Sequence, residues 1–580
     1  MSRISDLISP CLVPFQTVPR PDGKVVYRSE NFKLSERDII DQLSYTVSSD
    51  SSNRDTEGKV FYAERYGGIG MGPHGGGARC GYDGALYQVK GIGPNPLVGF
   101  TEATGQRDGI LPLQSAFHEM IWSRILQDKL PFGVVECLAI VALDSRKRAG
   151  ISIGTNAKRA LMIREICVRP AHFERAAYFR KKPYDPVADR SKDVLRVAAM
   201  CGKLPSALEL LLDCRDIPSD NVILDGLSNL AHRQALQLAF ARSHFLYHSI
   251  SSSNIAMDGR WLDFMSMTPL HARSISAKPM TSSAWSRWWG QDLIMIEILT
   301  SLVFHYCKFM KLPGSMCRAW INEITDKFSR DLVSAHTKYS LCTAGVPLVL
   351  AERVCLDGDV QHWASHFHEI LRNRWPKIER QGNPADVNTE RSLHDFTFSA
   401  ASNHPPTSLG LDDAEAIEYH SRRGKVKRLV ESDALTLGIS SENLMVGMTV
   451  NAIRFSAEKS DLSFSVFSKG IANVVKRFTQ NSKDFMHEIE NLTARMLRVG
   501  NFHLKFDPEF VVTCWDDGKV RVCYDMRDGY FAVVSGNKVD CISRGFARGY
   551  FENDNSMNPM IDFYRKFNAL FVFGCDKNEY

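Results

Sequence analysis

Apolar and polar residues alternate in several short segments of the first third of the chain, and this pattern predicts strands. In residues 86–90 (LYQVK) every second side chain falls on the same face, as in a half-buried strand. Residues 113–128 instead place apolar side chains at helical spacing. Strand-like runs follow at 134–143 and 160–168. We therefore expect a β-rich first part of the chain with one central helix.

From residue 194 onward the apolar residues recur with a helical period, and this continues to about residue 373. The most apolar window, residues 293–312, contains Glu297, His305, Lys308 and Lys311. A membrane-spanning helix would have to bury these groups in lipid. We therefore expect a helix packed in a protein core, and no membrane span.

The order of these segments predicts an α+β protein with five parts. Residues 1–60 are polar and are expected to form an irregular lead-in. A β-rich lobe over 61–185 and a helical lobe over 186–375 follow. A polar linker with several prolines is expected at 376–410. Residues 411–580 return to helices and then strands, and are expected to form an additional C-terminal domain.

Composition and charge are those of an ordinary globular protein. Apolar residues make up 44% and charged residues 24% of the chain, which argues against disorder. Lysine and arginine exceed aspartate and glutamate by 71 to 66, an excess that allows an anionic ligand but predicts no nucleic-acid partner. The cysteines form no C-x-x-C pair, and the first residues lack the pattern of a secretory signal. These features predict a cytoplasmic location.

A glycine-rich segment, a strand lysine and a helix glutamate follow one another in the first lobe. In a kinase fold the glycine-rich loop covers the phosphates of ATP, the lysine binds phosphate oxygens and the glutamate pairs with the lysine. The loop would be Gly75, Gly76, Gly77, Ala78 and Arg79, with Lys90 as the lysine and Glu119 as the glutamate. Glycine clusters and surface Lys and Glu residues are also common without any ligand, so this pattern alone is weak.

A second set of candidate residues lies in SSSNIAMDGRWLDF. A kinase-type site needs an asparagine and an aspartate to hold magnesium, and Asn254 and Asp263 are suitable oxygen ligands. Phe264 after Asp263 is similar to the start of a D-F-G motif. The segment also fits a plain hairpin that turns at Asp258 and Gly259, and both interpretations can hold together.

Four motifs in this order resemble the selenoprotein-O family of kinase-like proteins. YQVKGIGPNPLVG and RDGILPLQSAFHEMI resemble the family's L-K-G-x-G-x-x-P-x-S-R, D-G-R-A and R-E-F motifs. VRPAHFERAAYF resembles V-A-P-S-H-x-R-x-G-S-F, and NIAMDGRWLDF resembles N-M-S-I-L-G-x-T-x-D-Y-G. The resemblance covers about residues 65–270, and residues after about 400 match no pattern of the family.

The resemblance implies a bilobal, protein-kinase-like fold that binds ATP and Mg²⁺. Members of this family hold ATP flipped relative to ordinary kinases and transfer AMP to protein Ser, Thr or Tyr hydroxyls. By similarity, Lys90 and Glu119 would bind the nucleotide and Asn254 and Asp263 the metal. Arg175 would contact the phosphates. A second phosphate arginine would be Arg164 or Arg169, and we favour Arg164.

The chain departs from the family pattern at the catalytic step. The family has a carboxylate, T-D-N, directly before the metal-binding asparagine, whereas this chain has Ser253. A serine hydroxyl accepts a proton far less readily than a carboxylate at neutral pH. Asp258 is the nearest replacement in the sequence, although its position is not the family's. The family's P-x-S-R arginine and its D-Y-G glycine are also missing.

These observations lead to two functional hypotheses. The first is an ATP-dependent transferase that moves AMP, or otherwise activates with ATP, onto a protein or peptide acceptor. The second is a catalytically impaired pseudoenzyme that binds nucleotide or a partner and acts in regulation. Three other features are expected to be structural: the helical pair His244 and His248, the tryptophans at 285, 288 and 289, and the basic residues at 422–428.

Overall fold

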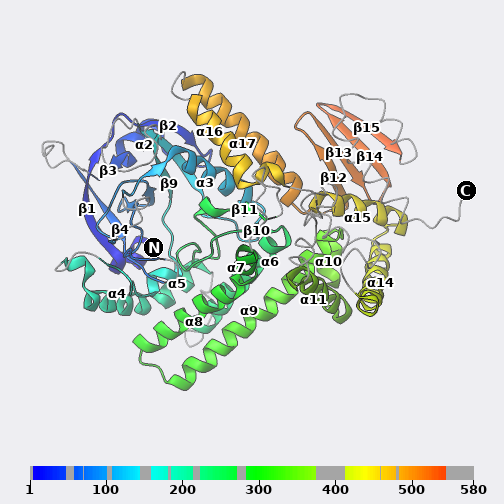
Figure 1. The fold of residues 1–580 in the computed structure, drawn as a ribbon, viewed down its shortest axis with the longest axis horizontal. Helices are drawn as coiled ribbons and strands as arrows, with labels where there is room; N and C mark the ends of the chain where they lie inside the picture. The colour runs from blue at the N-terminus through cyan, green and yellow to red at the C-terminus, as the bar shows by residue number, and fades with distance from the viewer. Residues whose placement is uncertain are drawn as a thin grey trace, which may run out of the picture.

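The computed structural model describes residues 4–47, 58–68, 71–100, 108–143, 158–180, 185–212, 222–270, 282–373, 412–456, 459–477, 482–507 and 509–543. Within these residues the chain is mixed α+β, with a large antiparallel sheet and many helices, which confirms the expected class. Figure 1 shows the large sheet on one side, long helices across the middle and a smaller sheet on the other side.

The large sheet places the Lys90 strand near its centre. Its strands run in the order β2-β8-β9-β6-β5-β4-β1-β3, with β7 paired to β9. The strands from the expected β-rich lobe are β4 (Lys59–Glu64), β5 (Cys80–Tyr82), β6 (Tyr87–Lys90), β7 (Leu111–Pro112), β8 (Cys137–Leu143) and β9 (Arg159–Glu165). Because β6 lies between β5 and β9, Lys90 is far from either edge of the sheet.

Residues before 60 belong to this sheet, so the expectation of an irregular lead-in was wrong. They form α1 (Ile4–Ile8), η1 (Ser9–Cys11), β1 (Leu12–Pro19), β2 (Lys24–Arg28), α2 (Glu36–Leu43) and β3 (Tyr45–Thr46). β1 pairs along its length with β4, and β2 pairs with β8. Most of β1 is only half-buried. Its pairing with β4, which lies more than 40 residues later in the chain, is what makes it a strand.

Helix α3 (Leu113–Leu126) carries Glu119 and is enclosed on both sides. Eleven of its 14 residues are buried. One side packs on β8 and β9, and the other packs on α16 (Phe464–Arg477) and α17 (Ser482–Leu504). Figure 1 shows α16 and α17 lying over α3. A helix covered on several sides needs apolar residues all round, not along a single stripe.

The expected helical lobe consists of helices below and beside the large sheet in Figure 1. They are η4 (Pro186–Ala188), α4 (Arg190–Gly202), α5 (Leu204–Leu211), α6 (Val222–Ser243), α7 (Ser282–Trp289), α8 (Gln291–Phe309), α9 (Gly314–Thr343), α10 (Leu348–Val354) and α11 (Gly358–Asn373). The short η3 (Pro170–Phe173) precedes them, at the end of the expected β-rich lobe. α8 buries Met295, Ile298 and Leu302 in the main core, as expected for the apolar window. Among the described helices, none has the length and apolar character needed to cross a membrane.

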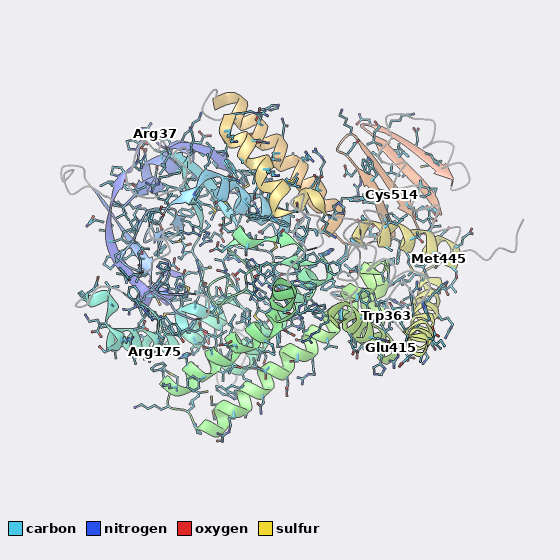
Figure 2. The ribbon with its side chains drawn as sticks, viewed as in Figure 1. Arg37, Arg175, Trp363, Glu415, Met445 and Cys514 are labelled. Carbon is cyan, nitrogen blue, oxygen red and sulfur yellow. The ribbon has the colours of Figure 1, made fainter. Side chains whose placement is uncertain are left out.

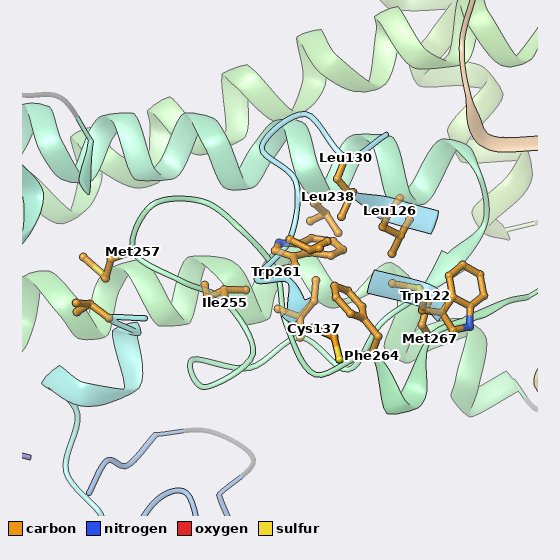
Figure 3. Close-up of a cluster of buried hydrophobic side chains, with 14 of the residues drawn as sticks. Trp122, Leu126, Leu130, Cys137, Leu238, Ile255, Met257, Trp261, Phe264 and Met267 are labelled. Atoms are coloured by element: carbon orange, nitrogen blue, oxygen red, sulfur yellow. The ribbon is translucent and has the colours of Figure 1, made fainter. Parts of the chain in front are cut away.

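A short hairpin that carries Asn254 and Asp263 lies between the sheet and these helices. It is framed by β10 (Leu246–Tyr247), β11 (Thr268–Pro269) and η5 (Phe264–Ser266). Figure 3 shows its apolar side chains packed against residues from α3, β8 and α6. The hairpin is therefore fixed to the core shared by the sheet and the helices.

The segment after residue 412 packs onto both earlier parts. Its elements are α14 (Asp413–Thr436), α15 (Ser441–Ser456), η7 (Ser460–Leu462), α16, α17, β12 (Val511–Asp516), β13 (Val520–Asp525), β14 (Tyr530–Ser535) and β15 (Lys538–Ser543). α16 and α17 share the core that contains α3, whereas α14, α15 and the small sheet share a core with α10 and α11. Figure 2 shows this second group through Trp363, Glu415, Met445 and Cys514. The hydrophobic cores thus cross the expected boundary at 376–410, a range that lies outside the described residues.

Candidate functional site

Lys90 lies at the centre of a buried ionic cluster. Its side chain is 1% exposed, and Nζ donates hydrogen bonds of 2.6 Å to Glu119 Oε2 and of 2.6 Å to Asp263 Oδ1. These residues come from β6, α3 and the hairpin after β10. The structure therefore brings together the lysine, glutamate and aspartate that the sequence analysis singled out. A lysine this deeply buried is rare unless its charge is paired.

Arg164 and Gln88 extend the cluster along the sheet. Gln88 is two residues from Lys90 and shares its face of β6, and it is paired with Arg164 across β6 and β9. Arg164 donates from Nε to Gln88 Oε1 (2.7 Å) and from Nη1 to Glu119 Oε1 (3.3 Å). Both oxygens of Glu119 are therefore bound by cationic groups. Gln88 was not among the residues predicted from the sequence, although the two-residue period of the strand placed it beside Lys90.

Arg169, the alternative to Arg164, also faces this site. It donates to Gln88 Oε1 (3.3 Å) and to the carbonyl of Ser253 (2.9 Å). The structure thus places both arginines at the site, with Arg164 against Glu119 and Arg169 against the Asn254 loop. Both guanidinium groups are buried, and each is held by Gln88.

Glu64 and His172 complete the buried network. The backbone N–H of Arg169 donates to His172 Nδ1 (3.1 Å), so the ring proton sits on Nε2 and is donated to Glu64 (3.2 Å). Gln88 Nε2 donates to the other oxygen of Glu64. Burial lowers the pKa of His172 even though Glu64 opposes this. Burial raises the pKa of Glu64, but His172, Arg169 and Gln88 outweigh it and hold that pKa below its usual range.

Asp263 stands at the open end of the hairpin in a rare backbone conformation. Its φ and ψ are 67° and 62°, in the left-handed region that non-glycine residues seldom adopt. Such strain persists only where the surroundings impose it, and it is concentrated at functional sites. Burial opposes ionisation of Asp263, but Lys90, Arg79 and Arg164 outweigh it and hold its pKa well below the usual range. The carboxylate is therefore ionised and remains 26% exposed.

An aromatic layer beneath the hairpin fixes this conformation. His248 stacks on Trp261 at 5.3 Å and contacts Phe264 at 5.2 Å between ring centroids. Trp261 Nε1 donates to Gln234 on α6 (2.8 Å). Figure 3 shows Trp261 and Phe264 in one cluster with Cys137 and Met267. Because Phe264 is anchored here, the preceding residue is directed toward Lys90.

Asn254 lies on the other strand of the hairpin, opposite Leu262, the residue before Asp263. The N–H of Leu262 donates to the carbonyl of Asn254 (3.0 Å), and Ile255 forms a bridge with Trp261. The side-chain amide of Asn254 donates to the carbonyl of Ser249 (2.7 Å), and its amide oxygen accepts from Ser253 Oγ (3.3 Å). One amide oxygen and one ionised carboxylate suit Mg²⁺, which fills its other positions with water and phosphate oxygens. Among the described residues, no set of three or more His, Cys, Asp or Glu is grouped to hold a metal on its own.

Ser253 and Asp258, the two candidates for the catalytic step, occupy different places. Ser253 Oγ lies 3.0 Å from Ser251 Oγ and donates to Asn254 Oδ1 (3.3 Å), so it belongs to the Asn254 loop. Asp258 is at the tip of the hairpin, opposite the open end where Asp263 stands. Its carboxylate accepts from the backbone N–H (3.0 Å) and from Nε (2.8 Å) of Arg260. The structure therefore gives Asp258 a turn-stabilising role, apart from the ionic cluster.

The glycine-rich segment is held by backbone contacts within the protein. The N–H of Gly75 donates to Leu97 O (2.9 Å) and that of Gly77 to Glu64 O (3.0 Å), so both amides are used in backbone hydrogen bonds within the protein. Gly76 pairs with Arg65 at φ 146°, where a Cβ would overlap the carbonyl of Glu64. Gly76 is therefore required by close backbone packing, whereas a Cβ on Gly75 would meet the ring of Phe179. The expectation that these glycines cover phosphates stays a prediction.

Two glycines earlier in the same segment approach the site instead. The N–H of Gly67 donates to Ala171 O (3.1 Å), which joins the loop to η3. A Cβ on Gly68 (φ 96°) would overlap Glu174 Oε2 and Ser252 Oγ. This approach could not be predicted, because nine glycines in one segment do not reveal which of them meets the opposite loop.

The two remaining arginine candidates differ in position. Arg79 directly precedes β5, and its charge acts on Asp263 and helps to lower the pKa of that carboxyl. Arg175 follows η3, and its guanidinium lies toward α8, where it adds to burial in lowering the pKa of His305. Figure 2 shows Arg175 on the side of α4 and α5. Arg79 therefore belongs to the cluster, whereas Arg175 is directed toward the helical part.

The other features of the sequence are structural, as expected. His244 stacks on Phe506 (4.7 Å between ring centroids) and His248 lies in the aromatic layer, and burial lowers the pKa of both rings. Trp288 is buried beside Trp289 and Phe245, whereas the side chain of Trp285 lies outside the described part of the chain. On α14 three basic residues pair with acidic neighbours: Arg422 with Glu418, Lys425 with Asp359, and Lys427 with Glu431.

The sequence matches no family model, and no match is found among curated proteins.

Proposed function

We propose that this protein is an ATP-dependent transferase of a bilobal, protein-kinase-like fold, related to the selenoprotein-O family. It binds ATP with Mg²⁺ and transfers AMP to a hydroxyl group of a protein or peptide. The single observation that carries the proposal is the buried contact of Lys90 with both Glu119 and Asp263. A cytoplasmic location, where ATP and Mg²⁺ are plentiful, is part of the proposal.

Each cationic residue of the cluster has a task in this proposal. Lys90 exchanges part of its contact with Asp263 for phosphate oxygens, while Glu119 keeps the lysine in place. Arg164, Arg169 and Arg79 add positive charge on the same side of the site. Such preorganised cations stabilise the charge that develops on a transferring phosphoryl group. Asn254 and Asp263 hold the magnesium ion that neutralises the phosphates.

A second candidate function is supported by the Asn254 loop. Residues 251–253 are all serines, so this loop has no carboxylate to accept a proton from an acceptor hydroxyl. A protein with this site and no such base would bind nucleotide without transferring any part of it. It would then act as a pseudoenzyme that signals through its nucleotide-bound state.

Labelled ATP distinguishes these possibilities. The protein is incubated with Mg²⁺ and ATP labelled on the α- or the γ-phosphate, and with candidate protein acceptors. Transfer of the α-label alone supports AMP transfer, and transfer of the γ-label supports a kinase. No label on any protein, together with a rise in Tm on adding ATP and Mg²⁺, supports the pseudoenzyme. If ATP neither binds nor raises Tm, nucleotide binding itself is overturned.

Matched variants identify the site. Lys90→Met and Asp263→Asn should each abolish ATP binding measured by calorimetry. Lys24→Ala and Asp528→Asn change an exposed lysine of β2 and an exposed aspartate in the turn between β13 and β14, and both should bind ATP as the wild type does. Equal loss in a matched control would show that the assay reports damage to the fold.

A further inference from the structure

Glu174 is a buried carboxylate directly beneath the glycine-rich loop. It follows η3, and its side chain is 3% exposed. Its Oε2 lies so close to Gly68 that a Cβ there would overlap both this oxygen and Ser252 Oγ. The backbone N–H of Ala171 donates to Ser252 O (3.0 Å), and the carbonyl of Glu174 is fixed by Arg196 (2.6 Å). Glu174 is thus held between the glycine loop and the loop that carries Asn254.

The carboxylate of Glu174 has an unused acceptor. Neither Glu174 Oε2 nor Ser252 Oγ has a partner that meets hydrogen-bond geometry, although both atoms are buried. A buried polar atom without a partner is costly and needs an explanation. Burial raises the pKa of Glu174, and the nearby hydroxyls of Ser252 and Ser301 oppose the rise without cancelling it. A carboxylate with a free oxygen and a raised pKa is a better proton acceptor than an ordinary surface carboxylate.

The other carboxylates of the site are already engaged. Both oxygens of Glu119 are bound by Lys90 and Arg164, and both oxygens of Glu64 are bound by His172 and Gln88. Lys90 holds Asp263, whose pKa is well below its usual range. A carboxylate bound in this way accepts a proton poorly. Of these four carboxylates, Glu174 alone has a buried oxygen without a hydrogen-bond partner.

Attack of a hydroxyl on a phosphorus atom needs a group that takes the hydroxyl proton. Residues 251–253 supply only serine hydroxyls, and Asp258 is bound to Arg260 at the hairpin tip. The group must lie within hydrogen-bond reach of the acceptor oxygen, beside the metal and the phosphates. Glu174 is next to Ser252, two residues from Asn254, and it comes from a segment that sequence spacing does not connect with that loop.

We propose that Glu174 is the general base of this site and accepts the proton of the acceptor hydroxyl. This inference rests on the proposed transferase function. The acceptor oxygen forms a bond to the α-phosphorus of ATP while its proton passes to Glu174 Oε2. The bond between the α-phosphorus and the bridging oxygen breaks, and pyrophosphate leaves with that electron pair. The proton on Glu174 is returned to solvent before the next turnover.

The test compares Glu174→Gln with Glu297→Gln in the full-length chain. Glu297 is an exposed carboxylate on α8 whose charge acts on Glu174, so its variant removes a nearby charge without removing the proposed base. ATP affinity is measured by calorimetry, and single-turnover transfer of the α-label is measured at saturating ATP and Mg²⁺. Glu174→Gln should slow transfer by at least about 100-fold, with ATP affinity and Tm near wild type. Glu297→Gln should transfer at close to the wild-type rate.

A pH profile separates a base from a merely structural residue. The wild-type transfer rate should rise with pH as Glu174 loses its proton and then level off, whereas Glu174→Gln should lack this rise. The charged groups packed around Glu174 are Glu297 from α8 and Arg196 from α4, so Glu297→Gln should keep the rise with a small shift. Glu174→Asp, which keeps a shorter carboxylate, should retain part of the rate and the same form of profile.

The possible outcomes are distinct. If the wild type transfers label and Glu174→Gln transfers it equally fast, the role of Glu174 is overturned while the transferase function stands. If Glu174→Gln loses activity only together with ATP binding or Tm, and Glu174→Asp shows no pH-dependent rise, Glu174 is structural and the proposal is overturned. If the wild type transfers no label to any acceptor, both the transferase function and the role of Glu174 are overturned.

Discussion

Lys90 carries one positive charge that two carboxylates share. Glu119 and Asp263 both lie 2.6 Å from Nζ, and the lysine itself is 1% exposed. Such a pair adds little net stability while it is intact, because desolvation offsets attraction. Removing one partner is costly, because it leaves buried charge without compensation. The same arrangement allows a nucleotide to compete with Asp263 for the lysine.

Replacing Lys90 should therefore destabilise the fold. Lys90→Met is expected to lower the free energy of unfolding by about 3–5 kcal/mol, measured by urea denaturation at pH 7. The double variant Lys90→Met, Glu119→Gln removes part of the uncompensated charge and should recover part of this loss. A loss below about 1 kcal/mol would mean that the cluster is open to water in solution.

Asp263 gives a prediction of pH dependence. Its pKa is lower in the folded protein than the value of about 3.9 in an unfolded chain. The ionised carboxylate therefore stabilises the fold above about pH 4, and this contribution disappears as the pH falls below that value toward the folded pKa. The difference in unfolding free energy between wild type and Asp263→Asn should be largest near pH 7 and should shrink below pH 4. Asp528→Asn, at an exposed position, should show no such trend; a gap that is constant with pH would contradict the assignment.

At the scale of elements, the strand β6, the helix α3 and the hairpin after β10 each bring one residue of the cluster. The glycine-rich segment has a different role, because the backbone packs so closely at Gly76 that only glycine fits there. An Ala at this position meets both a positive φ and the carbonyl of Glu64, whereas Gly72 (φ 57°) has open space around it. Gly76→Ala should therefore lower Tm clearly more than Gly72→Ala, which bears only the backbone cost of about 1 kcal/mol. Equal effects would contradict this packing.

The position of α3 depends on the helices α16 and α17. Phe467 on α16 lies 4.9 Å from the ring of His118 and 6.2 Å from Trp122, measured between centroids. Burial lowers the pKa of His118 to about 4, so this ring is neutral and packs as an apolar group. Gln114 at the start of α3 donates to Ser468 O (2.8 Å). Glu119 is thus held toward Lys90 by contacts on the opposite side of its helix.

Shortening Phe467 should weaken ATP binding without touching the site. Phe467→Ala is expected to cost about 3–5 kcal/mol of stability and to weaken ATP affinity between about twofold and thirtyfold. Phe531→Ala is the matched control, because Phe531 is equally buried but belongs to the core of the small sheet. It should lower stability to a similar extent and leave ATP affinity unchanged, as measured by calorimetry below the unfolding transition. An equal loss of affinity in both variants would contradict a specific role of α16.

At the scale of the whole molecule, the segment after residue 412 completes both hydrophobic cores. α16 and α17 join the core around α3, and α14, α15 and the small sheet join α10 and α11. A chain that ends at residue 410 would therefore expose the outer side of α3 and the surface of α11. Exposed apolar surface of this kind leads to aggregation or loss of structure. We expect such a chain to bind ATP at least tenfold more weakly than the full-length protein, if it stays in solution; full affinity in a folded 1–410 chain would contradict this dependence.

The sequence by itself determined the local elements and the chemical character of the main residues. Two-residue alternation placed Lys90 on a strand, helical spacing placed Glu119 on α3, and the turn at Asp258 and Gly259 matched the observed hairpin. These features are readable because each depends on neighbours within a few residues. The α+β class and the packed character of α8 could be predicted for the same reason.

Only the tertiary structure decided which residues meet. Lys90 and Asp263 are 173 residues apart in the chain, and Glu174 reaches the Asn254 loop from another segment. β1 is a strand because it pairs with β4. The amides of Gly75 and Gly77 donate hydrogen bonds to backbone carbonyls of distant residues. Helices α16 and α17 pack on the outer side of α3. Each of these depends on long-range contacts, which a local pattern does not contain. The residues of the ionic cluster could thus be proposed from the sequence. Their contacts with one another, and the unpartnered oxygen of Glu174 near them, could be seen only in the fold.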